Sequence, residues 1–388
     1  MIEIIDKAKC NGCSACVGVC PVNCIAMTPD PDGFLFPRVD TTACIDCGRC
    51  KRVCPVASKP SATTTRPVSY AVMNKNESIR EQSSSGGYFT LLASFVLAQG
   101  GVVFGAAFNQ DFEVEHICVE TESELAMLRG SKYTQSRIGD SFQRAKAFLE
   151  TGRQVLFSGT PCQIGGLYAF LGKPYDNLIT QDIICHGVPS PAVWKKYLGY
   201  RKQCAGSDLE NVSFRSKKHG WKRYRVAFRF SNGTGYESTV DKDPMMQVFL
   251  KDLCLRESCY DCAFKSVSRT ADITLADFWG IERVAPQMDD DKGTSLVVVH
   301  TEKGARIFES LREKAEVLAV DLDLAVSGNP AMIRSAKRAK KREQCMKELT
   351  AENFETVVKK YCKRSLWQKI KGKIKGLLRR LKKGFKKI

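Results

Sequence analysis

The sequence predicts a small α+β head, a larger α/β domain built on a mixed sheet, and a basic amphipathic helix at the end of the chain. Cysteines crowd the first 58 residues, and a polar stretch bracketed by prolines follows them. Apolar runs then alternate with segments of helical period, which is typical of an α/β domain. Lysine and arginine dominate the final segment. The predicted boundaries are 1–58 for the head, 59–67 for a linker, 68–330 for the large domain and 331–388 for a basic helical tail.

The composition is that of a globular protein whose thiols stay reduced. With 388 residues, 43% of them hydrophobic, the chain can bury one substantial core and a smaller one. Residues 1–7 contain no apolar signal segment, and no uncharged apolar run reaches the roughly 18 residues of a membrane-spanning helix. We therefore expect a cytoplasmic protein in which many of the 18 cysteines serve as metal ligands, not as disulfides.

Two copies of one cysteine motif are the strongest signal. The spacing CxxCxxCxxxCP occurs at Cys10, Cys13, Cys16 and Cys20, and again at Cys44, Cys47, Cys50 and Cys54. In such runs three thiolates bind one four-iron cubane and the fourth reaches the other cluster. The predicted ligand sets are Cys10, Cys13, Cys16 and Cys54 for one cluster, and Cys20, Cys44, Cys47 and Cys50 for the other. Structural zinc is the alternative, although tetrahedral zinc does not need two interleaved sets of thiolates.

Residues 1–58 resemble the bacterial two-cluster ferredoxins, which implies two 4Fe-4S clusters in an α+β ferredoxin-like head. Gly12 and Gly48 allow the backbone to fold closely around sulfur. Cys24 lies outside the ligand pattern, and we interpret it as a buried spare thiol.

The large domain shows alternating strand and helix signals. The expected strands are 102–108, 114–119, 154–157, 178–184, 226–230 and 295–300. The expected helices are 87–98, 139–150, 163–171, 191–203, 244–253 and 303–311. This alternation predicts the α/β arrangement of the domain.

Four cysteines of this domain are candidates for a third cluster. Cys162 is expected in the first turn of a helix that has Thr160 as N-cap and Pro161 as first residue, where the helix dipole favours a thiolate. That position suits either a ligand or a nucleophile. Cys185 ends an apolar strand. With the CxxC pair Cys259 and Cys262, these thiols are sufficient for one more cubane.

Two segments suggest where a phosphate group binds. Small residues at 83–87 precede a helix, whose first N–H groups favour an anion, although an ordinary capped helix explains them equally well. The loop 130–134 offers a lysine and hydroxyl groups, for a flavin pyrophosphate or for solvent.

The motifs SSSGG (83–87), RGSKY (129–133), GTPCQ (159–163), CHG (185–187), SCYDC (258–262) and DITLADFW (272–279) together resemble the coenzyme F420 hydrogenase/dehydrogenase beta-subunit family over residues 68–325. The resemblance implies a 4Fe-4S cluster and FAD, and electron transfer between a deazaflavin or ferredoxin and a substrate. It implies cluster ligation by Cys162, Cys185, Cys259 and Cys262, and places Ser85, Gly86, Gly87 and Lys132 near FAD. With its ferredoxin head and basic tail, this chain resembles the bacterial members that are often found beside surface-polysaccharide genes.

Other residues have both a functional and a structural interpretation. His186 is the candidate catalytic residue, as a proton donor or acceptor at the flavin, or else a structural histidine. Asp277 and Trp279 are candidates for the flavin pocket by resemblance, but an aromatic in an apolar segment usually belongs to the core. The basic loop 214–221 either binds an anionic substrate or faces solvent.

The net charge of +18 is unevenly distributed. Residues 363–388 contain 12 Lys or Arg residues and no acid, which leaves +6 for the rest of the chain. Apolar residues at spacings of three and four predict an interfacial helix on anionic lipid, and therefore a peripheral membrane association. The alternative is a basic tail that binds nucleic acid without specificity.

The resulting hypothesis is an iron–sulfur, FAD-dependent oxidoreductase that moves electrons between ferredoxin, a deazaflavin or a nicotinamide and an organic substrate. A non-catalytic ferredoxin-type carrier that docks a partner enzyme is the first alternative. A zinc-stabilised nucleic-acid-binding protein is the second, and no specific nucleic acid is expected.

Overall fold

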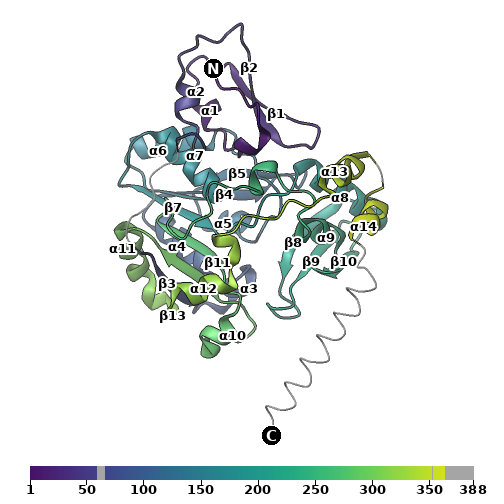
Figure 1. Cartoon of the computed structure of the whole chain (residues 1–388). Coiled ribbons are helices and arrows are strands. Elements are labelled where there is room, and N and C mark those ends of the chain that lie inside the picture. The colour runs from purple at the N-terminus through teal and green to yellow at the C-terminus, as the bar shows by residue number, and fades with distance from the viewer. Residues whose placement is uncertain (59–65, 352, 363–388) are drawn as a thin grey trace.

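The computed structural model describes residues 1–58, 66–351 and 353–362. The head lies on one end of a larger body, at the top of Figure 1. The body contains an eight-stranded mixed sheet and a separate three-stranded antiparallel sheet. The mixed sheet confirms the predicted α/β architecture.

The large sheet has the strand order β13-β3-β12-β11-β7-β6-β4-β5. In chain order its strands are β3 (Val68–Asn74), β4 (Val102–Phe108), β5 (Val114–Val119), β6 (Val155–Gly159), β7 (Leu178–Ile183), β11 (Ile273–Asp277), β12 (Ser295–Val299) and β13 (Ala315–Val320). The central strands β4, β6, β7 and β11 are parallel, and the other pairs are antiparallel. The carboxyl ends of the parallel strands therefore meet at one edge of the sheet.

Helices cover both faces of the large sheet. One face packs against α4 (Tyr88–Ala98) and α11 (Glu302–Leu311); the other packs against α6 (Ser141–Glu150), α7 (Pro161–Leu171), α10 (Ile281–Val284) and α12 (Leu322–Gly328). Successive residues of a strand enter opposite cores, so that Val297 of β12 packs with α4 and α11, and Val298 with α10 and α12. The short helices α3 (Glu77–Gln82) and α5 (Leu125–Leu128) lie in connections.

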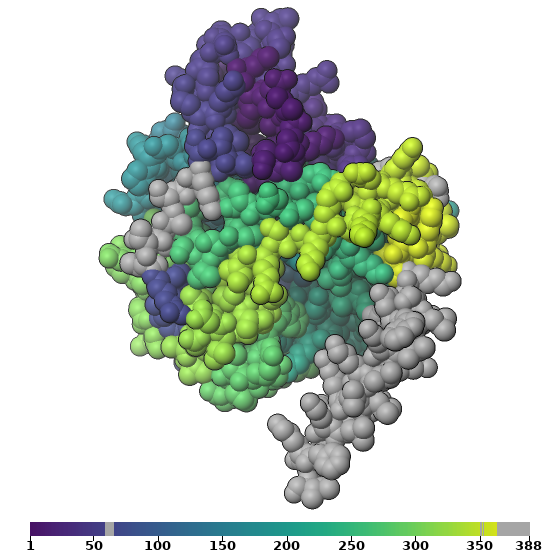
Figure 2. All heavy atoms as spheres, viewed as in Figure 1, coloured from purple at the N-terminus to yellow at the C-terminus, as the bar shows by residue number. Residues whose placement is uncertain are grey.

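The three-stranded sheet and four helices form a second core. The strands pair in the order β10 (Gly235–Thr239), β9 (Arg225–Phe230), β8 (Leu209–Ser216), and the helices are α8 (Pro191–Ala205), α9 (Pro244–Leu250), α13 (Arg342–Ala351) and α14 (Phe354–Cys362). Cys345, Leu349 and Val357 are fully buried in this core together with Trp194. The segment expected to be a tail from residue 331 therefore packs on the body as far as Cys362, across the face seen in Figure 2.

The predicted amphipathic helix, at residues 363–388, lies outside the described residues. So does most of the predicted linker, since only residues 66 and 67 of it are described. None of the described helices is long and apolar enough to cross a membrane.

The head is packed tightly on the body. It consists of the hairpin β1 (Ile25–Pro29) and β2 (Leu35–Val39) with the short helices α1 (Ala15–Gly18) and α2 (Arg49–Arg52). At the hairpin turn, Gly33 has φ +82° and approaches α8 so closely that an added Cβ would lie 2.3 Å from Ala192 Cβ. Phe34 is 2% exposed and belongs to the core of the smaller sheet. Head and body thus share packing, although the sequence suggested separate domains.

Candidate metal centres and cofactor edge

Two candidate thiols follow parallel strands at the carboxyl edge of the large sheet. β6 leads directly into α7, which has Thr160 as N-cap and Pro161 as its first residue, as the sequence predicts. Cys162 therefore lies in the first turn of α7. Cys185 comes just after β7, which pairs in parallel with β6. The parallel pairing brings the two thiols to the same edge.

One cavity at this edge is lined by Cys162, Cys185, Cys259 and Cys262. The last two come from the turn η2 (Glu257–Cys259) and the residues just after it. Three cations, Arg256, Lys265 and Arg269, line the same cavity. Their positive charge compensates the negative charge of thiolates, so the lining suits an anionic thiolate-bound group. We call this space the Cys162 cavity.

Burial raises the pKa of the thiols of Cys162, Cys185 and Cys259. For Cys185, Lys265 and Arg269 oppose that rise. Ligand thiols lose their protons when they bind metal, so binding here would be coupled to proton release. Within the described ranges, no three His, Cys, Asp or Glu side chains are spaced to hold a single metal ion. The thiols surround a space, and a thiolate-bound cluster fits this donor set.

The head contains two further cavities, each lined by one of the predicted ligand sets. The Cys10 cavity is lined by Cys10, Cys13, Cys16 and Cys54. The Cys20 cavity is lined by Cys20, Cys44, Cys47 and Cys50. Each cysteine run therefore contributes three thiols to one cavity and its fourth thiol to the other. Gly12 at φ +68° and Gly48 at φ +69° adopt the left-handed conformation that favours glycine.

Cys24, interpreted as a spare thiol, also lines the Cys20 cavity. Its Sγ lies 3.5 Å from Cys20 Sγ, and the residue is 8% exposed. Burial, reinforced by neighbouring Cys20, raises the pKa of the Cys24 thiol to about 12. A fifth thiol is therefore close to whatever the Cys20 cavity holds.

The two segments predicted to bind a phosphate lie together. The N–H and hydroxyl of Ser131 donate to Ser84 Oγ at 2.8 and 3.0 Å. Lys132, however, donates to the backbone carbonyls of residues 127–130 at 2.9 to 3.4 Å. Burial lowers the pKa of its ammonium group to about 7. The Lys132 side chain thus caps the end of α5.

The donors of Ser85 and Gly86 also have protein partners. The Ser85 hydroxyl donates to Thr294 O at 2.8 Å, and the Gly86 N–H donates to Ser295 Oγ at 3.0 Å. An added Cβ on Gly86 would lie 2.3 Å from a carbonyl oxygen of β3, so this position requires glycine for close packing. Gly87, at φ +84°, is the N-cap of α4. Of the four residues predicted near FAD, it is the one at the start of a helix.

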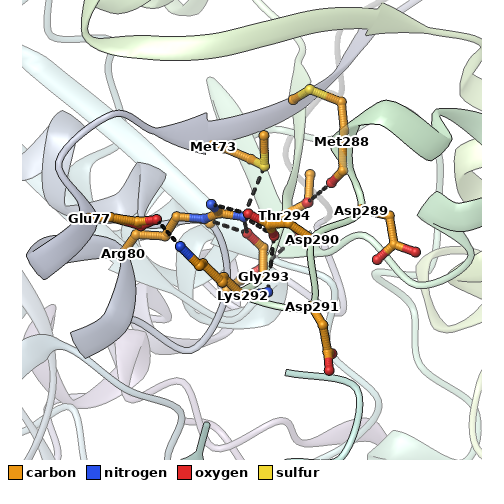
Figure 3. A network of polar contacts seen from close by, with 12 residues as sticks. Met73, Glu77, Arg80, Met288, Asp289, Asp290, Asp291, Lys292, Gly293 and Thr294 are labelled. Carbon is orange, nitrogen blue, oxygen red and sulfur yellow. Dashed lines mark hydrogen bonds and ion pairs between the residues drawn. The ribbon is translucent and has the colours of Figure 1, made fainter. Parts of the chain in front are cut away.

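A polar network next to this segment joins α3 to residues 288–294 (Figure 3). Arg80 donates to both carboxylate oxygens of Asp290, at 2.7 and 2.6 Å, and to Gly293 O. Lys217 Nζ contacts three carbonyls, those of Arg80, Ser85 and Lys292. Burial lowers the pKa of Lys217 to about 8. The basic loop 214–221 therefore reaches the predicted cofactor segment.

The same loop meets the end of β11. Arg215 donates to Asp277 through two nitrogens, at 2.6 and 3.0 Å, and its guanidinium lies over the Tyr224 ring. Trp221 stacks on Trp279 with ring centroids 4.8 Å apart and donates to Asp277 at 3.1 Å. Trp221 is buried and Trp279 is partly exposed, so the pair forms a wall at the carboxyl edge.

His186 lies on the wall of the Cys162 cavity. Its Nε2 is 2.6 Å from Asp252 Oδ1, and its side chain is 39% exposed. The contact with Asp252 leaves Nδ1 as the ring atom available to other groups. Sequence reasoning did not find Asp252, and it also missed Arg256 and Asn11, which line cysteine cavities. Asn11 is a non-cysteine position of the first cysteine run, whereas Asp252 and Arg256 belong to no motif. Only the fold brings Asn11 and Arg256 to the Cys162 cavity and Asp252 to His186 on its wall.

The body of the protein matches a known family. The family described as coenzyme F420 hydrogenase/dehydrogenase, beta subunit, matches with its N-terminal model over residues 69–142 and with its C-terminal model over 152–325. The chain belongs to this family. The two matches cover the sheet, the Cys162 cavity and the cofactor edge.

The head matches the 4Fe-4S dicluster domain over residues 9–58. This beta-subunit family member is therefore an iron–sulfur protein related to an oxidoreductase. Among solved structures, it is similar to a chain of the F420-reducing NiFe hydrogenase complex from Methanosarcina barkeri, studied after xenon derivatization. The identity is 17% over 76% of this chain and 91% of that chain, with a TM-score of 0.46. Among curated proteins no relative was detected.

Proposed function

We propose that this protein is an iron–sulfur flavoprotein oxidoreductase. Two 4Fe-4S clusters in the head and a third in the Cys162 cavity pass single electrons, and FAD exchanges electrons with an organic substrate. A flavin supplies the step between one-electron and two-electron chemistry when it is bound. The donor is a ferredoxin-like protein, a reduced deazaflavin or a nicotinamide. The substrate is proposed to belong to surface-polysaccharide metabolism.

The grouping of the predicted ligands supports this proposal. The 12 thiols singled out from the sequence line three cavities, with four in each. The other described cysteines, apart from Cys24, line none of these three cavities. Such a division is expected if each cavity holds one cubane.

We propose that the flavin binds where the segments 83–87 and 130–134 meet Lys217. The start of α4 lies at this point, and a helix N-terminus favours a pyrophosphate. Lys132, Ser85 and Gly86 shape the segment through their contacts with the protein, whereas Lys217 brings positive charge to Ser85 O. His186, held through Nε2 by Asp252, is left with Nδ1 to take up or release a proton.

Iron content tests the third cluster. Anaerobically purified protein is expected to contain about twelve irons and as many acid-labile sulfides, because each cubane has four of each. Cys259→Ser should lose about four irons. Cys254→Ser is the matched control. Cys254 is buried and lies five residues before Cys259 in the sequence, but it lines none of the three cavities. About eight irons in the unaltered protein, with Cys259→Ser indistinguishable from it, would exclude the third cluster.

Flavin content separates the oxidoreductase from the non-catalytic carrier. One FAD released per chain by denaturation is expected for the oxidoreductase. Clusters without any flavin, in protein purified anaerobically and supplied with FAD, would favour the carrier. Reduction of the visible spectrum by ferredoxin, deazaflavin or NAD(P)H then identifies the donor class.

A further inference from the structure

Asn11 lies between two of the cysteine cavities. Among the described residues that line them, it is the one common to the Cys10 cavity and the Cys162 cavity. Its side chain is 8% exposed, and its Nδ2 has no hydrogen-bond partner in the protein. A buried amide donor normally has an acceptor. We therefore expect the acceptor for Asn11 Nδ2 to be a group bound in one of the two cavities.

Arg256 holds the backbone at Cys10 directly and the backbone at Asn11 through Gln135. Gln135 Nε2 donates to Asn11 O at 3.1 Å, and Arg256 Nη1 donates to Gln135 Oε1 at 3.1 Å. Arg256 also donates through Nε to Cys10 O at 2.7 Å and contacts Cys10 Sγ at 3.5 Å. It is 1% exposed and lines the Cys162 cavity. One buried cation thus contacts a thiol of the first cavity and borders the second.

The packing of the head on α7 brings the same two cavities together. Gly166 follows Cys162 by about one helical turn. An added Cβ on Gly166 would lie 3.0 Å from Cys13 Sγ, so the Cys10 ligand set rests directly on the helix that carries Cys162. The Cys20 cavity, by contrast, shares no lining residue with the Cys162 cavity. Of the two head cavities, the Cys10 cavity is therefore the one that adjoins the Cys162 cavity.

We propose, on the premise of the proposed function, that electrons cross between head and body at the Cys10 cavity, and that Asn11 Nδ2–H donates to a cluster sulfur at this junction. In the crossing step, one electron leaves the reduced cluster of one cavity and enters the oxidised cluster of the other. No bond forms or breaks and no proton moves, and the electron comes from the one-electron donor that reduces the head. Asn11 is a positioning residue: its hydrogen bond stabilises the more negative, reduced form of the cluster that it contacts.

Midpoint potentials test this role independently of turnover. The full-length protein and its Asn11→Leu and Asn11→Gln variants are titrated with dithionite, and each cluster is followed by EPR. Asn11→Leu should lower the potential of one cluster, so that its ratio of reduced to oxidised form at fixed potential falls about tenfold, or ~59 mV. Asn11→Gln, which keeps an amide donor, should restore part of the shift. Asn23→Gly is the control, because Asn23 is exposed in the same head and has φ +52°, which glycine accepts.

A second measurement avoids any change at Asn11. Cys47→Ser removes the cluster of the Cys20 cavity, and the two remaining reduced clusters should broaden each other's EPR signals because their cavities adjoin. Isolated, unbroadened signals would overturn the junction, and so would unchanged potentials in Asn11→Leu protein that retains full iron. If the unaltered protein contains about eight irons, the proposed function itself fails. The iron assay therefore separates failure of the proposed function from failure of the junction.

Discussion

At the scale of single residues, burial and nearby charge determine the chemistry of each thiol. Cys185 has Lys265 and Arg269 beside it, so the positive charges favour its thiolate against the effect of burial. At Cys13 and Cys16, burial raises the pKa of both thiols to about 12, and neighbouring cysteines add to the rise. These groups remain protonated near neutral pH until metal displaces the proton. Acid should therefore release any metal that the thiols of the Cys10 cavity and the Cys162 cavity hold.

Cys24 leads to a prediction about ligand exchange. Cys20→Ser should retain more iron than Cys47→Ser, because Cys24 Sγ lies 3.5 Å from Cys20 Sγ in the same cavity and can replace it. The double variant Cys20→Ser/Cys24→Ser should lose about four irons. Iron per chain and the EPR spectrum of the reduced protein provide the measurement. Equal loss from Cys20→Ser and Cys47→Ser would contradict the exchange.

At the scale of secondary-structure elements, several residues predicted to contact the cofactor use their hydrogen-bond donors within the protein. Lys132 contacts four carbonyls at the end of α5, and Ser85 and Gly86 attach their segment to β12. Gly166 serves in the same way, because it allows α1 of the head to pack against α7. These contacts shape the cofactor edge without taking part in its chemistry.

Lys132→Met should lower the free energy of unfolding by about 1–2 kcal/mol, because the carbonyls at the end of α5 lose their donor. Urea titration followed by circular dichroism measures the change. Lys146→Met is the control, since the exposed ion pair of Lys146 with Glu150 contributes less than ~0.5 kcal/mol. Unchanged stability together with loss of bound FAD would instead support direct phosphate contact by Lys132.

At the scale of the whole molecule, the head packs on the body and shares a core with it. Its hairpin enters the core of the smaller sheet, and its Cys10 side adjoins the Cys162 cavity. Cys47, on the opposite cavity of the head, is exposed. Of the two head cavities, the Cys20 cavity thus contains the exposed thiol and the Cys10 cavity adjoins the body. The proposed function assigns the first to exchange with a partner and the second to transfer into the body.

The basic segment 363–388 yields a prediction at the same scale. Deleting it should leave the iron content unchanged and abolish flotation with vesicles that contain anionic lipid, because its apolar stripe and 12 cations are removed together. Vesicles of neutral lipid are the control. Flotation that survives the deletion would contradict a membrane role, and salt-sensitive binding of the intact protein to DNA would favour the alternative.

Local pattern was sufficient for part of this protein. The spacing of the head cysteines predicted two interleaved groups, because ligation within a run depends only on residues a few positions apart. The strands 102–108 and 114–119 and the start of α7 were predictable for the same reason, since period and capping are short-range. By contrast, β3, β8, β10, β11 and β13 were missed, because short apolar runs acquire their strand character from pairing partners.

The sequence by itself determined which thiols of the head belong together and which family the body belongs to. Only the tertiary structure decided that Cys162, Cys185, Cys259 and Cys262 line one cavity. It decided likewise that Asn11 of the head and Arg256 of the body lie where this cavity adjoins the Cys10 cavity. It also decided that the donors of Ser85, Gly86 and Lys132 are used within the protein. These outcomes depend on packing between segments far apart in the chain, and no local spacing encodes the partner that a side chain meets across the fold.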